Sequence, residues 1–174
     1  MATIIFNDNP SSMALFFWRI TKKIKMKSNI TGKTSITVVA PPSKVWDALT
    51  KPEIIKKYFF GTNASSDWKP GSPITYKGEW QGKTYEDKGT VLDAVPGKLL
   101  RHTYWSSMSG IEDKPENYVI VTYELTPANK GTTLTVTQEN IPDEKTKEHS
   151  LENWNMVLKN LKELLEKEEF VPSH

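Results

Sequence analysis

The sequence contains no cysteine among its 174 residues. This absence excludes disulfide bonds, thiol nucleophiles and cysteine-ligated zinc. Histidine is scarce as well, and His102, His149 and His174 are too far apart for the i, i+4 pair with which a helix binds zinc. No carboxylate-rich loop matches a calcium site. We therefore expect no metal ion, no cofactor and a cytoplasmic location.

Long apolar segments and an excess of one charge are also missing. The 23 basic and 21 acidic residues leave a net charge of +2, which does not predict nucleic-acid binding. The apolar run Met13–Trp18 is shorter than the roughly 20 residues of a membrane-spanning helix. Basic residues follow this run, whereas a signal peptide carries them before it. We predict no stable membrane insertion.

The first residues differ in composition from the rest of the chain. Residues 1–46 contain seven basic residues and one acidic residue. We interpret residues 1–30 as a flexible N-terminal extension and residues 31–170 as one domain. A chain start at Met26 and an amphipathic surface anchor are the two alternatives for this segment.

Aromatic residues are plentiful, with six Trp, six Tyr and six Phe in a chain that is 37% hydrophobic. Such a composition predicts a folded domain with a sizeable core. Residues 34–39 (TSITVV) are rich in β-branched side chains and predict a strand. Two short helices should follow at residues 44–49 and 52–58, since Pro52 is tolerated at the first position of a helix.

From residue 74 onward the apolar pattern alternates with a period of two, which is typical of strands. The predicted strands cover residues 74–80, 85–95, 99–105, 118–125 and 132–139. Because the connections are mostly short turns, the strands should form an antiparallel meander.

Residues 143–169 return to a helical period. Their apolar side chains recur at steps of three and four residues: Leu151, Trp154, Leu158, Leu161 and Leu165. Asp143 should cap the start of this helix. A sheet with one apolar face needs a cover, so the helix should lie across its concave face. The predicted fold class is α+β, with a curved antiparallel sheet and a long C-terminal helix.

Four segments of this order resemble a known family. They are APPSKVWDALTKPE (40–53), GTVLDAVPGKLLRHTYW (89–105), VTYELTPANKGTTLTVTQ (121–138) and ENWNMVLKNLKELLE (152–166). Together they are similar to the activator of heat-shock-protein-90 ATPase homologue family, within the START-like (SRPBCC, Bet v 1-like) helix-grip superfamily. The resemblance covers about residues 34–167.

The resemblance implies a helix-grip fold and little chemistry. Some members of the family are thought to bind apolar small molecules between the sheet and the helix. The founding members stimulate a chaperone ATPase and carry an additional N-terminal domain, which we do not expect in a chain of this length. The resemblance therefore implies a small-molecule partner first and a chaperone second.

Strand alternation predicts which side chains face the space beneath the helix. If Val121 and Tyr123 point inward, the same phase turns Leu100, His102 and Tyr104 inward on their own strand. The predicted lining comprises Tyr76, Val91, Leu100, His102, Tyr104, Val121, Tyr123, Val136, Gln138, Trp154 and Leu158. A mostly apolar space with a few polar tips would bind a small hydrophobic or amphipathic molecule. A fully packed core is the alternative.

Two polar residues deserve separate consideration. His102 could act as a general base or as a ligand hydrogen-bond partner, although a lone histidine is more often structural. Asp87 is in phase with Val91, but a solvated position at a strand end is our preferred interpretation. No Gly-x-Ser-x-Gly nucleophile motif occurs. We predict no catalytic residues, with a cyclase or hydrolase using His102, Tyr104 or Tyr123 as the alternative.

Overall fold

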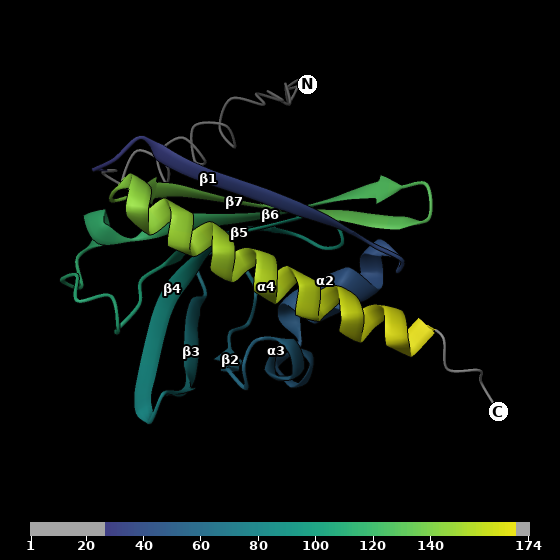
Figure 1. Ribbon diagram of the computed structural model, residues 1–174, viewed down its shortest axis with the longest axis horizontal. Helices are drawn as coiled ribbons and strands as arrows, with labels where there is room; N and C mark the ends of the chain where they lie inside the picture. Colours follow the sequence, from purple (N-terminus) through teal and green to yellow (C-terminus); the bar gives the residue numbers. More distant parts are fainter. Residues whose placement is uncertain (1–26, 170–174) are drawn as a thin grey trace, which may run out of the picture.

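The computed structural model describes residues 27–169, which form one curved antiparallel sheet gripped by helices (Figure 1). The seven strands pair in the order β1-β7-β6-β5-β4-β3-β2. Their bounds are β1 Ile30–Val38, β2 Asn63–Ser65, β3 Pro73–Trp80, β4 Lys83–Val95, β5 Leu99–Tyr104, β6 Val119–Ala128 and β7 Gly131–Ile141. The helices are α2 Pro42–Thr50, α3 Pro52–Tyr58 and α4 Glu144–Glu169, with a short 3₁₀ helix at Pro115–Asn117. The predicted fold class is confirmed.

Two details of the strand pattern differ from the prediction. The strand β2, which pairs with β3, was not predicted, because its three residues are too few to show a period. The strands predicted at residues 118–125 and 132–139 are both longer in the structure, where their ladder continues to the pair Ala128↔Gly131. Pro127 is tolerated there because the pairing of β5 with β6 reaches only to Leu99 opposite Glu124. Beyond that point β6 pairs with β7 alone.

The sheet bends sharply along β4. The first part of β4 pairs with β3 and its last part pairs with β5, with a register shift between Val91 and Asp93. Gly89 sits just before this shift, where an added Cβ would overlap the carbonyl oxygen of Thr103. Figure 1 shows β3 and the first part of β4 running steeply away from β1, β7 and β6. The bend produces a deep concave face.

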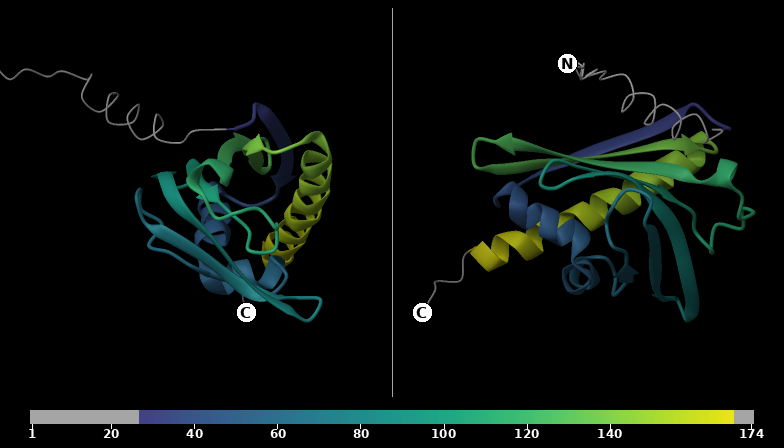
Figure 2. Two further views of the ribbon diagram at one scale, coloured as in Figure 1. Left: turned by 90° about the vertical axis from the view of Figure 1, so that its left-hand side faces the viewer. Right: turned by 180° about the vertical axis from the view of Figure 1, so that it is seen from behind.

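Helix α4 crosses that concave face, as the three views show (Figures 1 and 2). Its start is capped by Asp143, whose Oδ1 accepts a hydrogen bond of 2.7 Å from the Thr146 amide, as predicted. Its apolar stripe buries Leu158, Leu161 and Leu165. On its other edge α4 is tied to β1, where the Lys162 ammonium donates to the Thr37 carbonyl at 2.7 Å.

The two short helices close one end of the hollow. Tyr58, the last residue of α3, donates a hydrogen bond of 2.9 Å to the Ala48 carbonyl of α2. Val45, Ala48 and Leu49 of α2 are buried in the same core as Leu125 and Leu134 of the sheet. The two short helices therefore add to the core at this end of the concave face.

Candidate functional site

A cavity of about 320 Å³ lies between α4 and the bent sheet. It lies among side chains from α2, α3, five strands (β3 to β7) and α4, so every layer of the fold contributes to its wall. The lining residues are Leu49, Ile55, Tyr58, Phe59, Phe60, Thr62, Tyr76, Trp80, Tyr85, Asp87, His102, Tyr104, Met108, Val121, Tyr123, Gln138, Ser150, Asn153, Trp154, Val157, Leu158 and Leu161. The cavity is partly open, and Phe60, Trp80 and Met108 are 44%, 47% and 46% exposed.

The structure brings eight of the eleven predicted lining residues to this cavity. They are Tyr76, His102, Tyr104, Val121, Tyr123, Gln138, Trp154 and Leu158. Val91, Leu100 and Val136 are buried in the adjoining core instead. Leu100, Tyr123 and Val136 face each other across three strands, and only the long Tyr123 ring reaches the cavity from that row. Their roles in ligand binding remain predictions.

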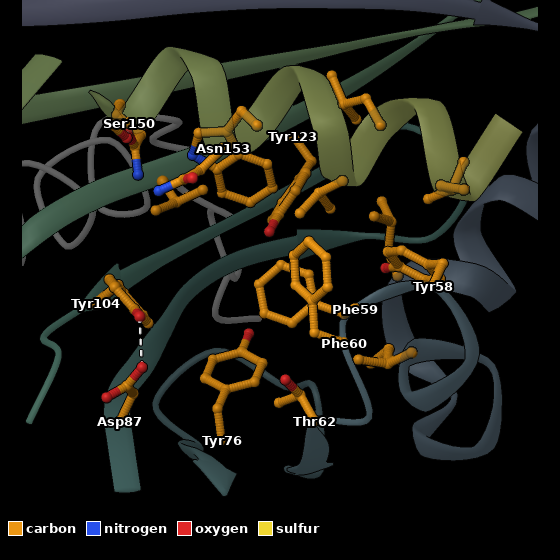
Figure 3. Close-up of a pocket in the computed structure, with 18 of the residues that line it drawn as sticks. Tyr58, Phe59, Phe60, Thr62, Tyr76, Asp87, Tyr104, Tyr123, Ser150 and Asn153 are labelled. Atoms are coloured by element: carbon orange, nitrogen blue, oxygen red, sulfur yellow. Dashed lines mark hydrogen bonds between the residues drawn. The ribbon is translucent and has the colours of Figure 1, made fainter. Parts of the chain in front are cut away.

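Aromatic rings form most of one wall. The ring centroid of Phe59 lies 6.4 Å from that of Tyr76 and 6.3 Å from that of Trp154. Tyr123 is 5.7 Å from Trp154, and Tyr76 is 6.1 Å from Tyr104. Figure 3 shows the hydroxyl ends of Tyr76 and Tyr123 pointing toward the middle of the cavity. Burial raises the pKa of both hydroxyls, so they keep their protons.

Sequence reasoning missed Phe59 and Phe60, which follow the last residue of α3. Phe60 adopts the left-handed region with φ 51°, and Gly61 follows with φ 76°. This tight exit from the helix turns Phe59 toward Trp154 and leaves Phe60 against Trp80, with centroids 5.6 Å apart. Two aromatic residues before a glycine at a helix end were the available signal, but their direction depends on the bend of the sheet.

Asp87 is buried at 7% exposure and lines the cavity, so the preferred interpretation as a solvated strand end was wrong. The strand β4 begins four residues earlier than Asp87, which pairs with Tyr76 inside the ladder. Its Oδ2 accepts a hydrogen bond of 2.6 Å from the Tyr104 hydroxyl (Figure 3). Its Oδ1 accepts from the Ser107 amide at 2.9 Å and the Ser107 hydroxyl at 3.2 Å.

Tyr104 serves as a stable donor to this carboxylate. Burial, followed by the charge of Asp87 and the hydrogen bond to it, raises the pKa of the Tyr104 hydroxyl well above its usual value. The phenol therefore stays protonated at any physiological pH. The pair holds one fixed negative charge at the edge of an aromatic space.

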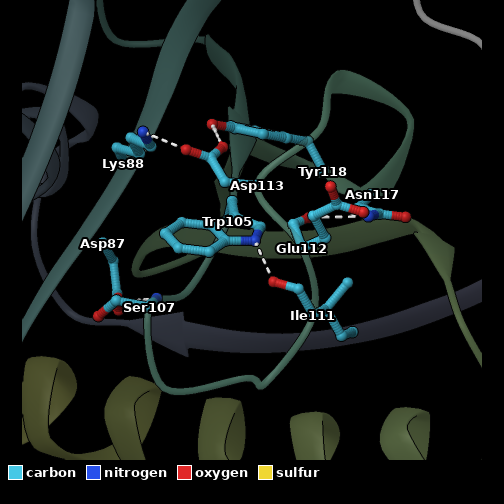
Figure 4. A network of polar contacts seen from close by, with 9 residues as sticks. All are labelled: Asp87, Lys88, Trp105, Ser107, Ile111, Glu112, Asp113, Asn117 and Tyr118. Carbon is cyan, nitrogen blue, oxygen red and sulfur yellow. Dashed lines mark hydrogen bonds and ion pairs between the residues drawn. The ribbon is translucent and has the colours of Figure 1, made fainter.

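The loop after β5 carries Ser107 to this carboxylate, and a polar network fixes the loop (Figure 4). The Lys88 ammonium forms an ion pair with Asp113 and lies 5.5 Å from the centroid of the Trp105 ring. The Trp105 indole N–H donates to the Ile111 carbonyl at 3.0 Å. The Tyr118 hydroxyl donates to Asp113 at 2.6 Å. Lys88 and Asp87 are adjacent on β4, so one strand holds both the loop and the carboxylate.

His102 is 2% exposed and stacks on Tyr123 with ring centroids 5.8 Å apart. Its Nδ1 lies 2.9 Å from the Thr103 carbonyl oxygen, so Nδ1 carries the proton and donates. Its Nε2 has no hydrogen-bond partner among the described residues. Burial lowers the pKa of His102 to about 4, so the ring is neutral near pH 7. The imidazole is a neutral acceptor held in the wall.

Two further polar pairs lie on the cavity wall. The Ser150 hydroxyl of α4 donates to the Gln138 side chain of β7. The Thr62 and Tyr85 hydroxyls are 2.6 Å apart, and Gly78 leaves room for the Tyr85 ring. Within residues 27–169, no group of three or more His, Asp or Glu side chains could hold a metal ion. No helix in that range is long and apolar enough to cross a membrane.

The grip of α4 over a bent antiparallel sheet, with a cavity between them, defines a protein of the START-like helix-grip class. Residues 39–166 match the family described as activator of Hsp90 ATPase homolog 1-like protein, and the chain belongs to this family. The family resemblance found in the sequence is confirmed.

Solved structures agree with this assignment. A solution structure from Cytophaga hutchinsonii is 45% identical and covers 84% of this chain and 100% of its own, with a TM-score of 0.71. A crystal structure from Chromobacterium violaceum is 26% identical, covers 78% and 96% of the two chains, and has a TM-score of 0.65. The Aha1 dimer from Colwellia psychrerythraea shares the fold at 22% identity, 78% and 96% coverage and a TM-score of 0.63. A comparison with curated proteins found no match.

Proposed function

We propose that this protein binds a small, mostly hydrophobic molecule in the cavity beneath α4. The observation that carries the proposal is a space of about 320 Å³ whose walls are aromatic and aliphatic apart from a few polar tips. This size falls within the range of small-molecule sites in proteins, roughly 300 to 1,000 Å³. A cavity this large also weakens the core around it, so retaining it is costly to stability.

The test uses a neutral fluorescent probe, N-phenyl-1-naphthylamine, titrated into the full-length protein. We expect saturable binding at one site with increased probe emission. Val157→Phe should weaken binding at least tenfold, because Val157 is buried on α4 and lines the cavity, where a phenyl ring would occupy ligand space.

Met156→Phe is the matched control. Met156 precedes Val157 on the helix but is 50% exposed, so the same ring would point into solvent and leave binding unchanged. Circular dichroism should show equal helix content in both variants. Absence of saturable binding to the wild-type protein, or equal affinity for a folded Val157→Phe variant, would rule out the proposed site. If Val157→Phe does not fold, Val157→Leu with the same readout replaces it.

Family membership supports a second candidate function, the binding of a chaperone through the protein surface. This candidate does not require the cavity, so Val157→Phe should retain it. Co-purification of the wild-type protein and of the Val157→Phe variant with the chaperone would separate the two candidates. Equal chaperone capture by both proteins, together with no probe binding, would favour the second.

A further inference from the structure

The charged groups of the cavity are strongly one-sided. Asp87 is the one carboxylate among its described lining residues, which include no lysine and no arginine. His102 contributes no positive charge near pH 7, because burial lowers its pKa to about 4. A ligand in this space therefore meets a single negative charge with no cationic side chain in the wall.

The Asp87 carboxylate retains capacity for one more hydrogen bond. A carboxylate offers about four acceptor positions. Oδ1 uses two of them on Ser107, and Oδ2 uses one on Tyr104. The three donors are neutral, so no formal positive charge among them balances the carboxylate. One position on Oδ2 remains, at the edge of the cavity.

The surrounding aromatic rings should also attract a cation, as the carboxylate does. The faces of aromatic rings carry partial negative charge and attract cations placed over them. Tyr76 and Tyr104 are edge to face with centroids 6.1 Å apart, and Tyr104 is the residue that donates to Asp87. Tyr76 is also directly opposite Asp87 in the β3–β4 ladder, so a cation beside Oδ2 would lie near the Tyr76 ring as well as next to the carboxylate.

We propose that the ligand carries a positively charged amine on an apolar body, with the ammonium group beside Asp87 and the body against the aromatic wall. This inference rests on the proposed function and specifies its ligand class. Asp87 is already removed from water in the free protein, so binding adds little to its desolvation cost. A carboxylate ligand such as a fatty acid would place a second negative charge in the same water-poor space.

The experiment compares three indole probes of the same shape: tryptamine, indole-3-ethanol and indole-3-acetate. Isothermal titration calorimetry on the full-length protein at pH 7 should rank the amine first, the alcohol second and the acid last. We expect the amine to bind roughly tenfold more tightly than the alcohol, as for one charge-assisted hydrogen bond. Asp87→Asn should remove this preference and leave the affinity for the alcohol within roughly threefold.

Glu86→Gln is the matched control. Glu86 is adjacent to Asp87 on β4, points to the opposite face and pairs with Lys77 at 3.3 Å in solvent, so its loss removes the same charge from outside the cavity. The amine preference should persist in this variant. Binding of the alcohol as tightly as the amine would overturn the inference and leave the proposed function standing. Failure of the amine to bind overturns the inference, and if the neutral naphthylamine also fails to bind, the proposed function falls with it.

Discussion

At the scale of single residues, His102 should make the stability of the protein depend on pH. Its pKa is about 4 in the folded protein, lowered by burial from 6.5. Above pH 6.5 the ring is neutral in both states. As the pH falls from 6.5 to 4, the unfolded chain takes up the proton first, so the free energy of unfolding decreases. The loss below pH 4 amounts to about 3 kcal/mol for this shift.

Urea unfolding at pH 7.5, 5.5 and 4.5 measures this dependence. The His102→Gln variant should lose less stability than the wild type over that range, because glutamine does not titrate. His149→Gln should behave like the wild type, since His149 is exposed on α4. Parallel curves for the wild type and His102→Gln would contradict the assignment of a neutral buried ring.

Asn140 of β7 joins two other segments of the chain through its side chain. Its Oδ1 accepts hydrogen bonds from the amides of Lys27 at 2.7 Å and Ser28 at 3.0 Å. Its Nδ2 donates to the carbonyls of Glu116 at 3.0 Å and Tyr118 at 2.8 Å. It is buried and adopts the left-handed region with φ 64°. Asn140→Ala should lower the free energy of unfolding by about 3 kcal/mol, because several partners lose their bonds.

Asn140→Gly separates the loss of the side-chain hydrogen bonds from the backbone strain of a residue with positive φ. It also removes the side chain, but glycine adopts a positive φ without strain. We therefore expect it to be about 1 kcal/mol more stable than Asn140→Ala. Chemical denaturation of the three proteins gives the comparison. If alanine and glycine are equally destabilising, the backbone conformation contributes nothing measurable and the hydrogen bonds alone explain the effect.

At the scale of elements, the bend in β4 depends on Gly89. An added Cβ there would overlap the Thr103 carbonyl oxygen on β5, a backbone atom that cannot move without separating the strands. Gly89→Ala should lower the free energy of unfolding by about 3 kcal/mol, the cost of severe overpacking. Thermal and chemical denaturation would measure the loss.

Gly82 provides the comparison. It has a φ of 75° in the turn between β3 and β4, with open space where a Cβ would stand. Gly82→Ala should cost only the strain of a left-handed alanine, about 1 kcal/mol. A Gly89→Ala variant as stable as Gly82→Ala would show that the strands can part at the bend without loss.

Helices and strands could be predicted where the apolar pattern repeats over many residues. The alternation in β6 and the three- and four-residue steps in α4 identified both elements, because each buries one face over many residues. The short strand β2 gave no such signal. The bend at Gly89 depends on a contact between two strands, and a glycine in a strand is ambiguous until its neighbour is known.

At the scale of the whole molecule, the candidate site was predictable on the strands and on the apolar stripe of α4, where Trp154 and Leu158 line the cavity, but not in the loops. Alternation placed His102, Val121 and Gln138 in one row across three strands, and all three line the cavity. Asp87 was misjudged because its exposure depends on the loop that brings Ser107 to it. Phe59 is there because of the exit from α3, and Met108 because of the loop after β5. The positions of Asp87, Phe59 and Met108 depend on tertiary contacts of loops, which no local sequence pattern specifies.

The cavity should also affect the local opening of α4 in the protein without ligand. Around Ser150 and Trp154, α4 covers the cavity with half-buried side chains, whereas Leu158, Leu161 and Leu165 further along the helix are fully buried. Local stability follows the density of buried apolar contacts. We therefore expect the amides of residues 150–155 to exchange their hydrogens faster than those of residues 158–165 in the free protein.

A saturating ligand should reverse this difference, because opening the first half of α4 must then release the ligand. At a free concentration of 100 times the dissociation constant, exchange at residues 150–155 should slow by about 100-fold. Hydrogen exchange followed by NMR, with and without N-phenyl-1-naphthylamine, measures the effect residue by residue. The amides of the β6–β7 ladder serve as the internal reference. Slowing restricted to that ladder, with none in residues 150–155, would mean that the molecule is held at a place other than the space beneath α4.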